Sequence, residues 1–283
     1  KSVICIGMGN EGASAGHTAG TLEENTEERI PLAVQMKETA INVQIWKSYH
    51  DIVDISLISP AGVQIGPIPE VIGTQRFVVG DTEILLYYGE PSPFHVSQEI
   101  FIEFLPKDSY ITPGIWQFVL TPRKIVTGEY DLWLPSENVL NRGTAFRYPT
   151  ERGTLTIPST SQRVISVGAY DSLTFAYADF SGRGGLEGES KPDLVAPGVD
   201  ITAPTPSGIY QTFTGTSFAT PFVSGAAALM MEWGIVRGND PYLYGEKVKA
   251  YLRRGARPLP GFTEYPNPQV GYGALCLRDS LPL

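Results

Sequence analysis

The chain has 283 residues, of which 42% are hydrophobic and 18% are charged, so it can bury at least one substantial core. Its formal net charge of −9 argues against a nucleic-acid-binding surface, because neutralising phosphates requires clustered lysine and arginine. No uninterrupted apolar run reaches the length of a membrane span, and the first residues lack a signal-peptide pattern. We therefore expect neither nucleic acid nor membrane among its partners.

The chain begins with a short apolar run at residues 2–7, as expected for a strand that is buried on both faces of a parallel sheet. Gly7 to Gly12 follow as a tight, glycine-rich loop at the carboxyl end of this strand, where open α/β sheets bind their ligands. The side-chain amide of Asn10 can donate a hydrogen bond to a developing negative charge there. The simpler alternative is that Asn10 is a turn former that tolerates a left-handed backbone.

From about residue 31 to residue 150 the apolar residues alternate with a period of two, which predicts β-strands. Proline and glycine turns separate the strands at spacings typical of an all-β sandwich. The alternating segments are residues 41–45, 53–57, 83–87, 99–104, 116–120 and 130–134. This region has the size of one domain, roughly 120 residues, and we expect it to fold separately.

Aromatic residues of this region include Trp46, Trp116 and Trp133. They could form a platform that binds sugars, but aromatic side chains more often fill the core between two sheets, and we favour the core. His50 and His95 have no metal-ligand spacing, so we expect them at the surface.

After residue 150 the pattern of an α/β protein returns. Apolar runs at residues 163–169 and 193–198 predict two more buried strands. Residues 219–231 predict a helix rich in small residues, which we expect to be buried. A second, amphipathic helix is expected from Asp240 to about Arg254, because Asp240 and the proline after it are a helix-start signal.

A Gly-Thr-Ser turn leads directly into the first of these helices. The N–H groups in the first turn of a helix have no intrahelical acceptor, and the positive end of the helix dipole favours an anion. Ser217 therefore lies where an oxyanion can be held. The alternative is that Thr216 or Ser217 only caps the helix, which is common for these residue types.

Four motifs, in this order along the chain, resemble those of the subtilisin-like serine proteases, the subtilases of peptidase family S8. The motifs are Gly9 to Gly12 after a buried strand, the strand at residues 164–169, Lys191 to Gly198, and Gly215 to Pro221. The presence of a β-sandwich between the asparagine and the serine resembles the clostridial subtilases that are associated with spore germination.

The resemblance implies an α/β fold with an incomplete subtilisin-like parallel-sheet core. Residues 1–30 and 151–283 would form this C-terminal part of the catalytic domain, and residues 31–150 would form an inserted, jelly-roll-like β-sandwich. Two cysteines, Cys5 and Cys276, are too few for a disulfide framework and are expected as small buried residues. Together these features favour a reducing intracellular or spore compartment.

The resemblance also implies roles for individual residues. Ser217 matches the nucleophile that attacks the scissile carbonyl. Asn10 matches the side-chain donor of the oxyanion hole, in which the backbone N–H of Ser217 is the second donor and Thr216 a supporting neighbour. Donors that are fixed where charge develops stabilise the transition state more than the ground state.

The substrate pocket follows from the same comparison. Gly7, Met8 and Gly9 match the strand beside the pocket for the residue before the scissile bond, and Pro158 would close the floor of that pocket. Members of the family often bind calcium, but no calcium ligands can be identified in this sequence. No Cys/His metal cluster or phosphate-binding loop is present either, so we expect no cofactor.

The sequence departs from the family pattern in one respect. A subtilase carries its catalytic Asp and His before the oxyanion asparagine, in Asp-Gly and His-Gly-Thr contexts, and this sequence has neither motif. His17 follows the asparagine, so it does not match the general base, and we expect it in a loop. A serine without a base is a weak nucleophile at neutral pH.

We therefore expect a C-terminal fragment of a serine endopeptidase that acts on proteins or peptides and is inactive alone. It would associate with itself or with a companion N-terminal fragment that carries Asp and His. The alternative is a noncatalytic pseudoprotease, or a regulatory ligand-binding protein, of the same fold.

Overall fold

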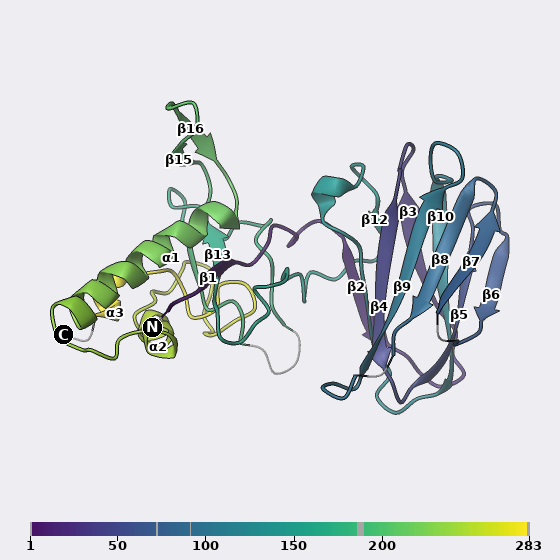
Figure 1. Cartoon of the computed structure of the whole chain (residues 1–283), viewed down its shortest axis with the longest axis horizontal. Helices are drawn as coiled ribbons and strands as arrows, with labels where there is room; N and C mark the ends of the chain where they lie inside the picture. The colour runs from purple at the N-terminus through teal and green to yellow at the C-terminus, as the bar shows by residue number, and fades with distance from the viewer. Residues whose placement is uncertain (1, 72, 91, 186–189, 282–283) are drawn as a thin grey trace. The chain divides into compact units, whose positions relative to one another are not determined.

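The computed structural model describes residues 2–71, 73–90, 92–185 and 190–281 (Figure 1). The chain divides into two compact units, each with its own hydrophobic core. Unit 1 comprises Lys1–Ala13 and Glu151–Leu283, and unit 2 comprises Ser14–Thr150.

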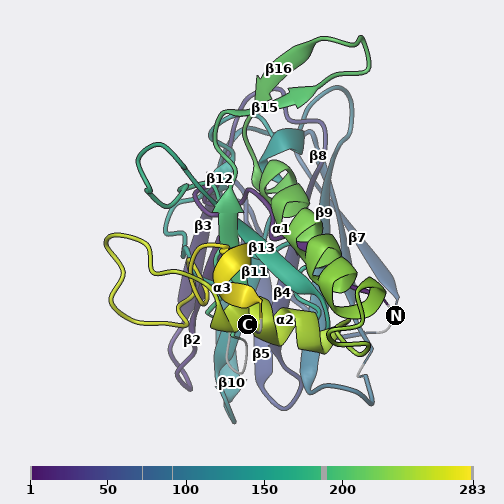
Figure 2. The same ribbon diagram turned by 90° about the vertical axis from the view of Figure 1, so that its left-hand side faces the viewer.

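Unit 1 is built on a sheet of three parallel strands in the order β1-β13-β14. Every residue of β13 is buried, as predicted for a strand covered on both faces. Helix α1 packs against all three strands and lies alongside β13 in Figure 2. The elements are β1 (Cys5–Gly7), β13 (Ile165–Tyr170), β14 (Leu194–Pro197), the hairpin β15 (Ile201–Pro204) and β16 (Tyr210–Phe213), α1 (Thr216–Met231), the π-helix η2 (Glu232–Val236), α2 (Glu246–Arg254) and α3 (Leu277–Ser280).

Helix α1 differs from its prediction in one respect. Only one of its faces is buried: Val223 and Met230 lie in the core, whereas Phe222 is 43% exposed and Leu229 is 54% exposed. The helix carries no charged residue on any side, so composition alone could not show that one side lacks a cover in the described part of the chain.

The second helix begins later than predicted. Asp240 does not start it but accepts the backbone N–H of Tyr242 at 3.1 Å in a turn, and α2 begins at Glu246. Gly245 separates the two with φ of 54°, a left-handed conformation that interrupts a helix. The Asp-Pro signal therefore belongs to a turn.

Unit 2 consists of two antiparallel sheets whose inner faces share one core cluster. The strand orders are β12-β3-β10-β5-β6 and β2-β11-β4-β9-β8-β7. The elements are β2 (His17–Thr21), β3 (Glu28–Val34), β4 (Ile41–Ser48), β5 (Ile52–Ile58), β6 (Gln64–Ile68), β7 (Thr74–Val79), β8 (Thr82–Tyr88), β9 (Ser97–Pro106), β10 (Gly114–Lys124), β11 (Glu129–Trp133), the 3-10 helix η1 (Glu137–Val139) and β12 (Ala145–Phe146).

The alternating segments predicted from the sequence all coincide with strands of this unit, namely β4, β5, β8, β9, β10 and β11. The predicted division of the chain at residue 30 differs from the observed one, which falls between Ala13 and Ser14. The reason is strand pairing, because β2 pairs with β11 and β3 pairs with β10. Strand β2 is short and carries no apolar alternation, so its pairing with β11 could not be predicted from the sequence.

The prediction that the tryptophans of unit 2 fill its core is correct for Trp116 and wrong for Trp46 and Trp133. Trp116 is 0% exposed and donates its indole N–H to the carbonyl of Thr112 at 2.9 Å. Trp46 and Trp133 instead lie half-buried on the outer face of the six-stranded sheet, because the buried residues of β4 and β11 are Ile45 and Leu132.

The histidines differ from one another as well. His50 and His95 are exposed, as expected. His17 is not a loop residue: it lies in β2, is 2% exposed, stacks on Trp133 with ring centroids 4.5 Å apart, and its Nε2 lies 2.8 Å from a carboxylate oxygen of Asp131.

Candidate active site

The loop after β1 is held from two sides. The backbone N–H of Met8 donates to the carbonyl of Val167 at 3.0 Å, and the carbonyl of Met8 accepts the N–H of Thr156 at 3.2 Å. Gly9 has φ of 92°, and a Cβ at this position would lie 2.5 Å from Cγ2 of Thr156. Only glycine meets both constraints, so the backbone can pass close to Thr156 and then turn towards Asn10.

The turn before α1 is held by the end of β14. The N–H of Gly215 donates to the carbonyl of Gly198 at 2.8 Å, and Gly215 has φ of 150°. A Cβ on Gly198 would lie 2.6 Å from Cβ of Ala169, so this contact also depends on glycine. The glycine that ends the third predicted strand therefore positions the first turn of the helix.

Asn10 and Thr216 join these two loops. The side-chain oxygen of Asn10 accepts the backbone N–H of Thr216 at 3.0 Å and lies 3.2 Å from its hydroxyl. Because the amide oxygen is committed to Thr216, the amide nitrogen is left as the donor of this side chain. Asn10 is exposed, so that nitrogen can reach a ligand at the helix N-terminus.

Ser217 follows Thr216 at the start of α1 and is exposed. Its backbone N–H belongs to the first helical turn, whose donors have no intrahelical acceptor. One further contact fixes this turn, because Thr220 donates its hydroxyl to the carbonyl of Thr216 at 2.8 Å. Pro221 has no N–H, so the carbonyl of Ser217 receives no hydrogen bond from it. The hydrogen bond between Asn10 and Thr216 thus brings Asn10 to the start of the helix, next to the exposed Ser217.

The residues predicted to line a substrate pocket lie in different surroundings. Gly7 lies beneath the helix start, since a Cβ there would be 3.1 Å from the hydroxyl oxygens of Thr216 and Thr220. The side chain of Met8 is fully buried, and its sulfur would lie 2.8 Å from a Cβ on Gly168. Pro158 is exposed.

Sequence reasoning missed Thr156 and Gly198, which touch the site loops directly. Thr156 precedes the Ile-Pro pair in a stretch without periodicity, so nothing in the pattern indicates its contact with Gly9. Gly198 was recognised only as part of a motif, and its packing against Ala169 depends on the parallel pairing of β13 and β14.

A buried ionic cluster surrounds Asp193, the residue directly before β14. The carboxylate of Asp193, which is 0% exposed, accepts the backbone N–H of Ser166 at 2.6 Å and pairs with Lys191, Lys249 and Arg253. Burial lowers the pKa of the Lys191 ammonium, and the charge of Asp193 acts in the opposite direction. The cluster ties the start of β14 to β13 and to α2.

No group of three or more His, Cys, Asp or Glu side chains within residues 2–71, 73–90, 92–185 and 190–281 could hold a metal ion. All three histidines lie in unit 2, so unit 1 has no imidazole of its own. Cys5 and Cys276 are free and half-buried, and burial raises the pKa of the Cys5 thiol.

Comparison with known proteins relates this geometry to one family. Residues 148–273 match the subtilase family, Peptidase S8. The chain is 34% identical to the serine protease AprX of Bacillus subtilis over 150 residues, which are 46% of this chain and 32% of AprX. It is 38% identical to an intracellular serine protease of Paenibacillus polymyxa over 105 residues, which are 36% of this chain and 30% of the relative. The chain thus spans about a third of these relatives.

A solved structure matches over a much larger share of the chain. The CspB protease of Clostridium perfringens superimposes with a TM-score of 0.90 at 40% sequence identity, over 98% of this chain and 58% of that one. Residues 148–273 are therefore similar to the subtilase family, Peptidase S8, and the chain closely resembles a clostridial CspB protease in structure.

Proposed function

We propose that unit 1 supplies the nucleophile and the oxyanion hole of a serine endopeptidase. Oγ of Ser217 attacks the scissile carbonyl carbon and gives its proton to a base. The carbonyl oxygen becomes an oxyanion held by the N–H of Ser217 and the amide nitrogen of Asn10. Collapse of this intermediate expels the amine with a proton and leaves an acyl-enzyme, which water then hydrolyses. The single observation that carries the proposal is the Asn10–Thr216 hydrogen bond beside Ser217.

We propose that the base comes from another polypeptide segment. Unit 1 contains no histidine, and a serine hydroxyl without an adjacent base reacts slowly. We propose a companion segment that carries the His and the Asp that orients it, or self-association that fulfils the same need. The chain by itself would then be inactive.

The surface of unit 1 supports a companion. Strand β1 is at the edge of its sheet in the described part of the chain, and Phe222 and Leu229 are exposed on α1. Residues 216–236 form a segment long and apolar enough to cross a membrane by length and composition alone, but its inner face packs in the core of unit 1. A covering polypeptide would satisfy the open edge and bury the outer apolar face.

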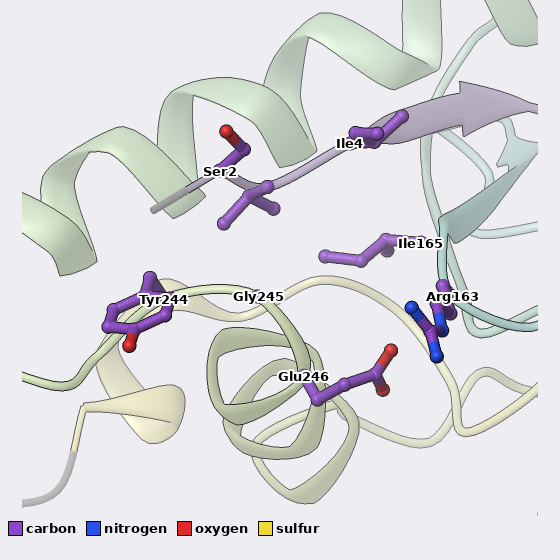
Figure 3. A pocket seen from close by; sticks show the side chains of 8 residues that line it. Ser2, Ile4, Arg163, Ile165, Tyr244, Gly245 and Glu246 are labelled. Carbon is purple, nitrogen blue, oxygen red and sulfur yellow. The ribbon is translucent and has the colours of Figure 1, made fainter.

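A cavity of about 310 Å³ adjoins this edge (Figure 3). Apolar side chains of Val3, Ile4 and Ile165 line it, and Arg163 and Glu246 bring opposite charges to it. A companion side chain could fill this space. The cavity lies beside the amino end of β1, away from the loop that carries Asn10, so we assign it to assembly and not to catalysis.

Substrate binding would use backbone groups near the start of α1. We propose that Gly7, Met8 and Gly9 flank the side chain before the scissile bond and that Pro158 lies at the floor of its pocket. Thr156 would narrow this pocket, because it contacts Gly9. Protein or peptide substrates fit this arrangement, and the reaction as proposed uses no cofactor.

We further propose that unit 2 is a jelly-roll-like β-sandwich inserted into the catalytic domain. The shared core of its two antiparallel sheets and the CspB likeness support this. A role in spore germination and a reducing intracellular or spore compartment are proposals that rest on the family resemblance and on the two free cysteines.

A noncatalytic binding protein of the same fold is the second candidate, and the lack of an imidazole in unit 1 favours it. Labelling with a fluorophosphonate probe separates the two. The protein is purified from the cells that make it, so that any companion stays bound, and is compared with a Ser217→Ala variant. We expect labelling of Ser217 only in the unaltered protein. Equal labelling of both, or none of either, would remove Ser217 as nucleophile.

A further inference from the structure

The six-stranded sheet of unit 2 has an outer face that is rich in aromatic residues. Its strands β8, β9 and β4 lie side by side (Figure 1), and β11 pairs with β4. Their outward side chains align across the strands in two neighbouring rows. One row is Tyr87, Phe101, Gln44 and Trp133, and the other is Glu99, Trp46 and Asp131. We call these seven residues the aromatic face.

The side chains of this face combine two chemistries. Tyr87 is 39% exposed and the other three aromatic side chains are half-buried, although each stands on the outside of the sheet. Amide and carboxylate groups alternate with them: Gln44 lies between Phe101 and Trp133, and Trp46 lies between two carboxylates. Apolar rings and strong hydrogen-bond acceptors are thus interleaved.

This combination suits a sugar ring. A pyranose has an apolar face of C–H groups, which aromatic side chains bury by dispersion and hydrophobic contact. Its hydroxyl groups donate well to ionised carboxylates. Adjacent strands are about 4.8 Å apart, close to the length of one pyranose unit in an extended chain, so successive sugars could meet successive strands.

The charge of the face narrows the choice of ligand. Glu99 and Asp131 belong to it, and Glu103 continues it one row further on β9. Arg76 on β7 is already paired with Glu83, and Lys47 points into the interior. A negative surface repels phosphates and uronic acids and accepts uncharged or amino-bearing sugars.

Contacts within unit 2 hold two of the rings, Trp133 and Trp46, in place without a ligand. Trp133 stacks on His17 with an angle of 2° between the ring planes, and His17 lies 2.8 Å from the carboxylate of Asp131. Trp46 packs near His95, with centroids 5.9 Å apart. Side chains fixed in this way lose little conformational entropy on binding.

We propose that the aromatic face binds an extended glycan chain of uncharged or amino-bearing hexoses. The polar groups at alternate positions distinguish this face from the continuous apolar core of a protein–protein interface. The inference does not depend on Ser217 or on any catalytic activity, because it concerns unit 2 alone.

Isothermal titration of the full chain with three hexasaccharides tests the proposal: one of unsubstituted glucose, one of glucosamine, and one of galacturonic acid. We expect the glucose or the glucosamine chain to bind and the galacturonate chain to fail. Trp46→Ala and Phe101→Ala should each weaken binding about tenfold, a loss near the upper end of what one aromatic contact contributes. Tyr110→Ala is the matched control, because Tyr110 is 46% exposed in a loop outside the face and should leave the affinity unchanged.

Near-ultraviolet circular dichroism of each variant shows whether unit 2 is still folded, and quenching of tryptophan fluorescence by the sugar gives a second readout of binding. Binding of neither uncharged nor amino-bearing chain would overturn the proposal. Equal affinity of Trp46→Ala, Phe101→Ala and the unaltered protein would do so as well. If the unaltered protein binds no glycan and forms a dimer that these variants lose, the face pairs with a second copy instead and the proposal is wrong.

Discussion

The side-chain oxygen of Asn10 accepts the backbone N–H of Thr216 at 3.0 Å, although the two residues lie 206 positions apart. The helix that carries Ser217 therefore also orients the amide beside it. One hydrogen bond serves two purposes, since it satisfies a free N–H of the helix start and directs the amide nitrogen of Asn10 outward.

Replacing Asn10 separates these two purposes. Asn10→Asp keeps an oxygen that accepts the Thr216 N–H but loses the donor, whereas Asn10→Ala loses both. In the protein purified together with its proposed companion, we expect both variants to slow peptide hydrolysis by about 10²- to 10³-fold, the loss caused by removing an oxyanion-hole donor of subtilisin. Only Asn10→Ala should also destabilise unit 1, by about 1 kcal/mol. Turnover and urea denaturation measure the two effects, and unchanged turnover in Asn10→Asp would remove Asn10 from the oxyanion hole.

Glycine substitutions test the contact behind the helix start. Gly198→Ala places a methyl group 2.6 Å from Cβ of Ala169 and should cost about 1–3 kcal/mol, because neither strand can move aside. Gly225→Ala is the matched control: it meets no atom within 4 Å and should stabilise the helix by about 0.5–1 kcal/mol. Hydrogen exchange of β13 and α1 reports both changes. Equal stability of the two variants would contradict the packing described for Gly198.

We expect the buried carboxylate of Asp193 to contribute strongly to the stability of unit 1. Asp193→Asn leaves the cationic groups of Lys191, Lys249 and Arg253 without their shared counter-charge. We expect a loss of about 3–5 kcal/mol in the free energy of unfolding of unit 1. The exposed pair of Arg257 and Asp279 serves as the control, since Asp279→Asn should change stability far less. Urea denaturation followed by Trp233, with the other tryptophans replaced by phenylalanine, isolates unit 1.

Acid should weaken unit 2 through Asp51. Burial acts to raise the pKa of this carboxyl, but the backbone N–H groups of Val126, Thr127 and Gly128 and the Thr127 hydroxyl together bring it below its ordinary value of 3.8. The stabilisation is complete above about pH 4 and is lost as the pH falls through the lower, folded-state value.

Asp51→Asn should remove this part of the pH dependence and lower stability at neutral pH. Asp54→Asn is the control, because Asp54 forms an exposed pair with Arg123. Unfolding midpoints between pH 2 and pH 7 measure both. A midpoint that falls with acid equally in Asp51→Asn and in the unaltered protein would refute the assignment.

Much of the fold could be predicted from local patterns. Apolar runs predicted β1, β13 and β14, and alternation predicted the long strands of unit 2, because both patterns follow directly from which faces a strand buries. The strand β2 and the turn at Asp240 could not be predicted in this way. Their conformations depend on pairing with β11 and on the left-handed Gly245, which are properties of tertiary structure.

In the candidate site, too, some residues could be predicted from local sequence and others depend on tertiary structure. Ser217 and Asn10 were identifiable because their motifs are local, and their proximity followed only from the family resemblance. Thr156 was out of reach, because its contact with Gly9 requires the return of the chain after unit 2. The outward positions of Trp46 and Trp133 could have been inferred from strand parity, since each follows a buried isoleucine or leucine in its strand.

The two ends of unit 2 lie next to each other: Thr150 donates its N–H to the carbonyl of His17 at 2.9 Å. In unit 1, the chain on either side of the insertion is joined in the same way, by the Thr156–Met8 hydrogen bond. While unit 2 is folded, closing the loop from Asn10 to Thr154 therefore costs little more chain entropy than closing a short turn. If unit 2 unfolds, the closure entropy grows with the logarithm of its length and falls on the loop that holds Asn10. The stability of unit 2 should thus contribute to how long the loop that carries Asn10 stays ordered.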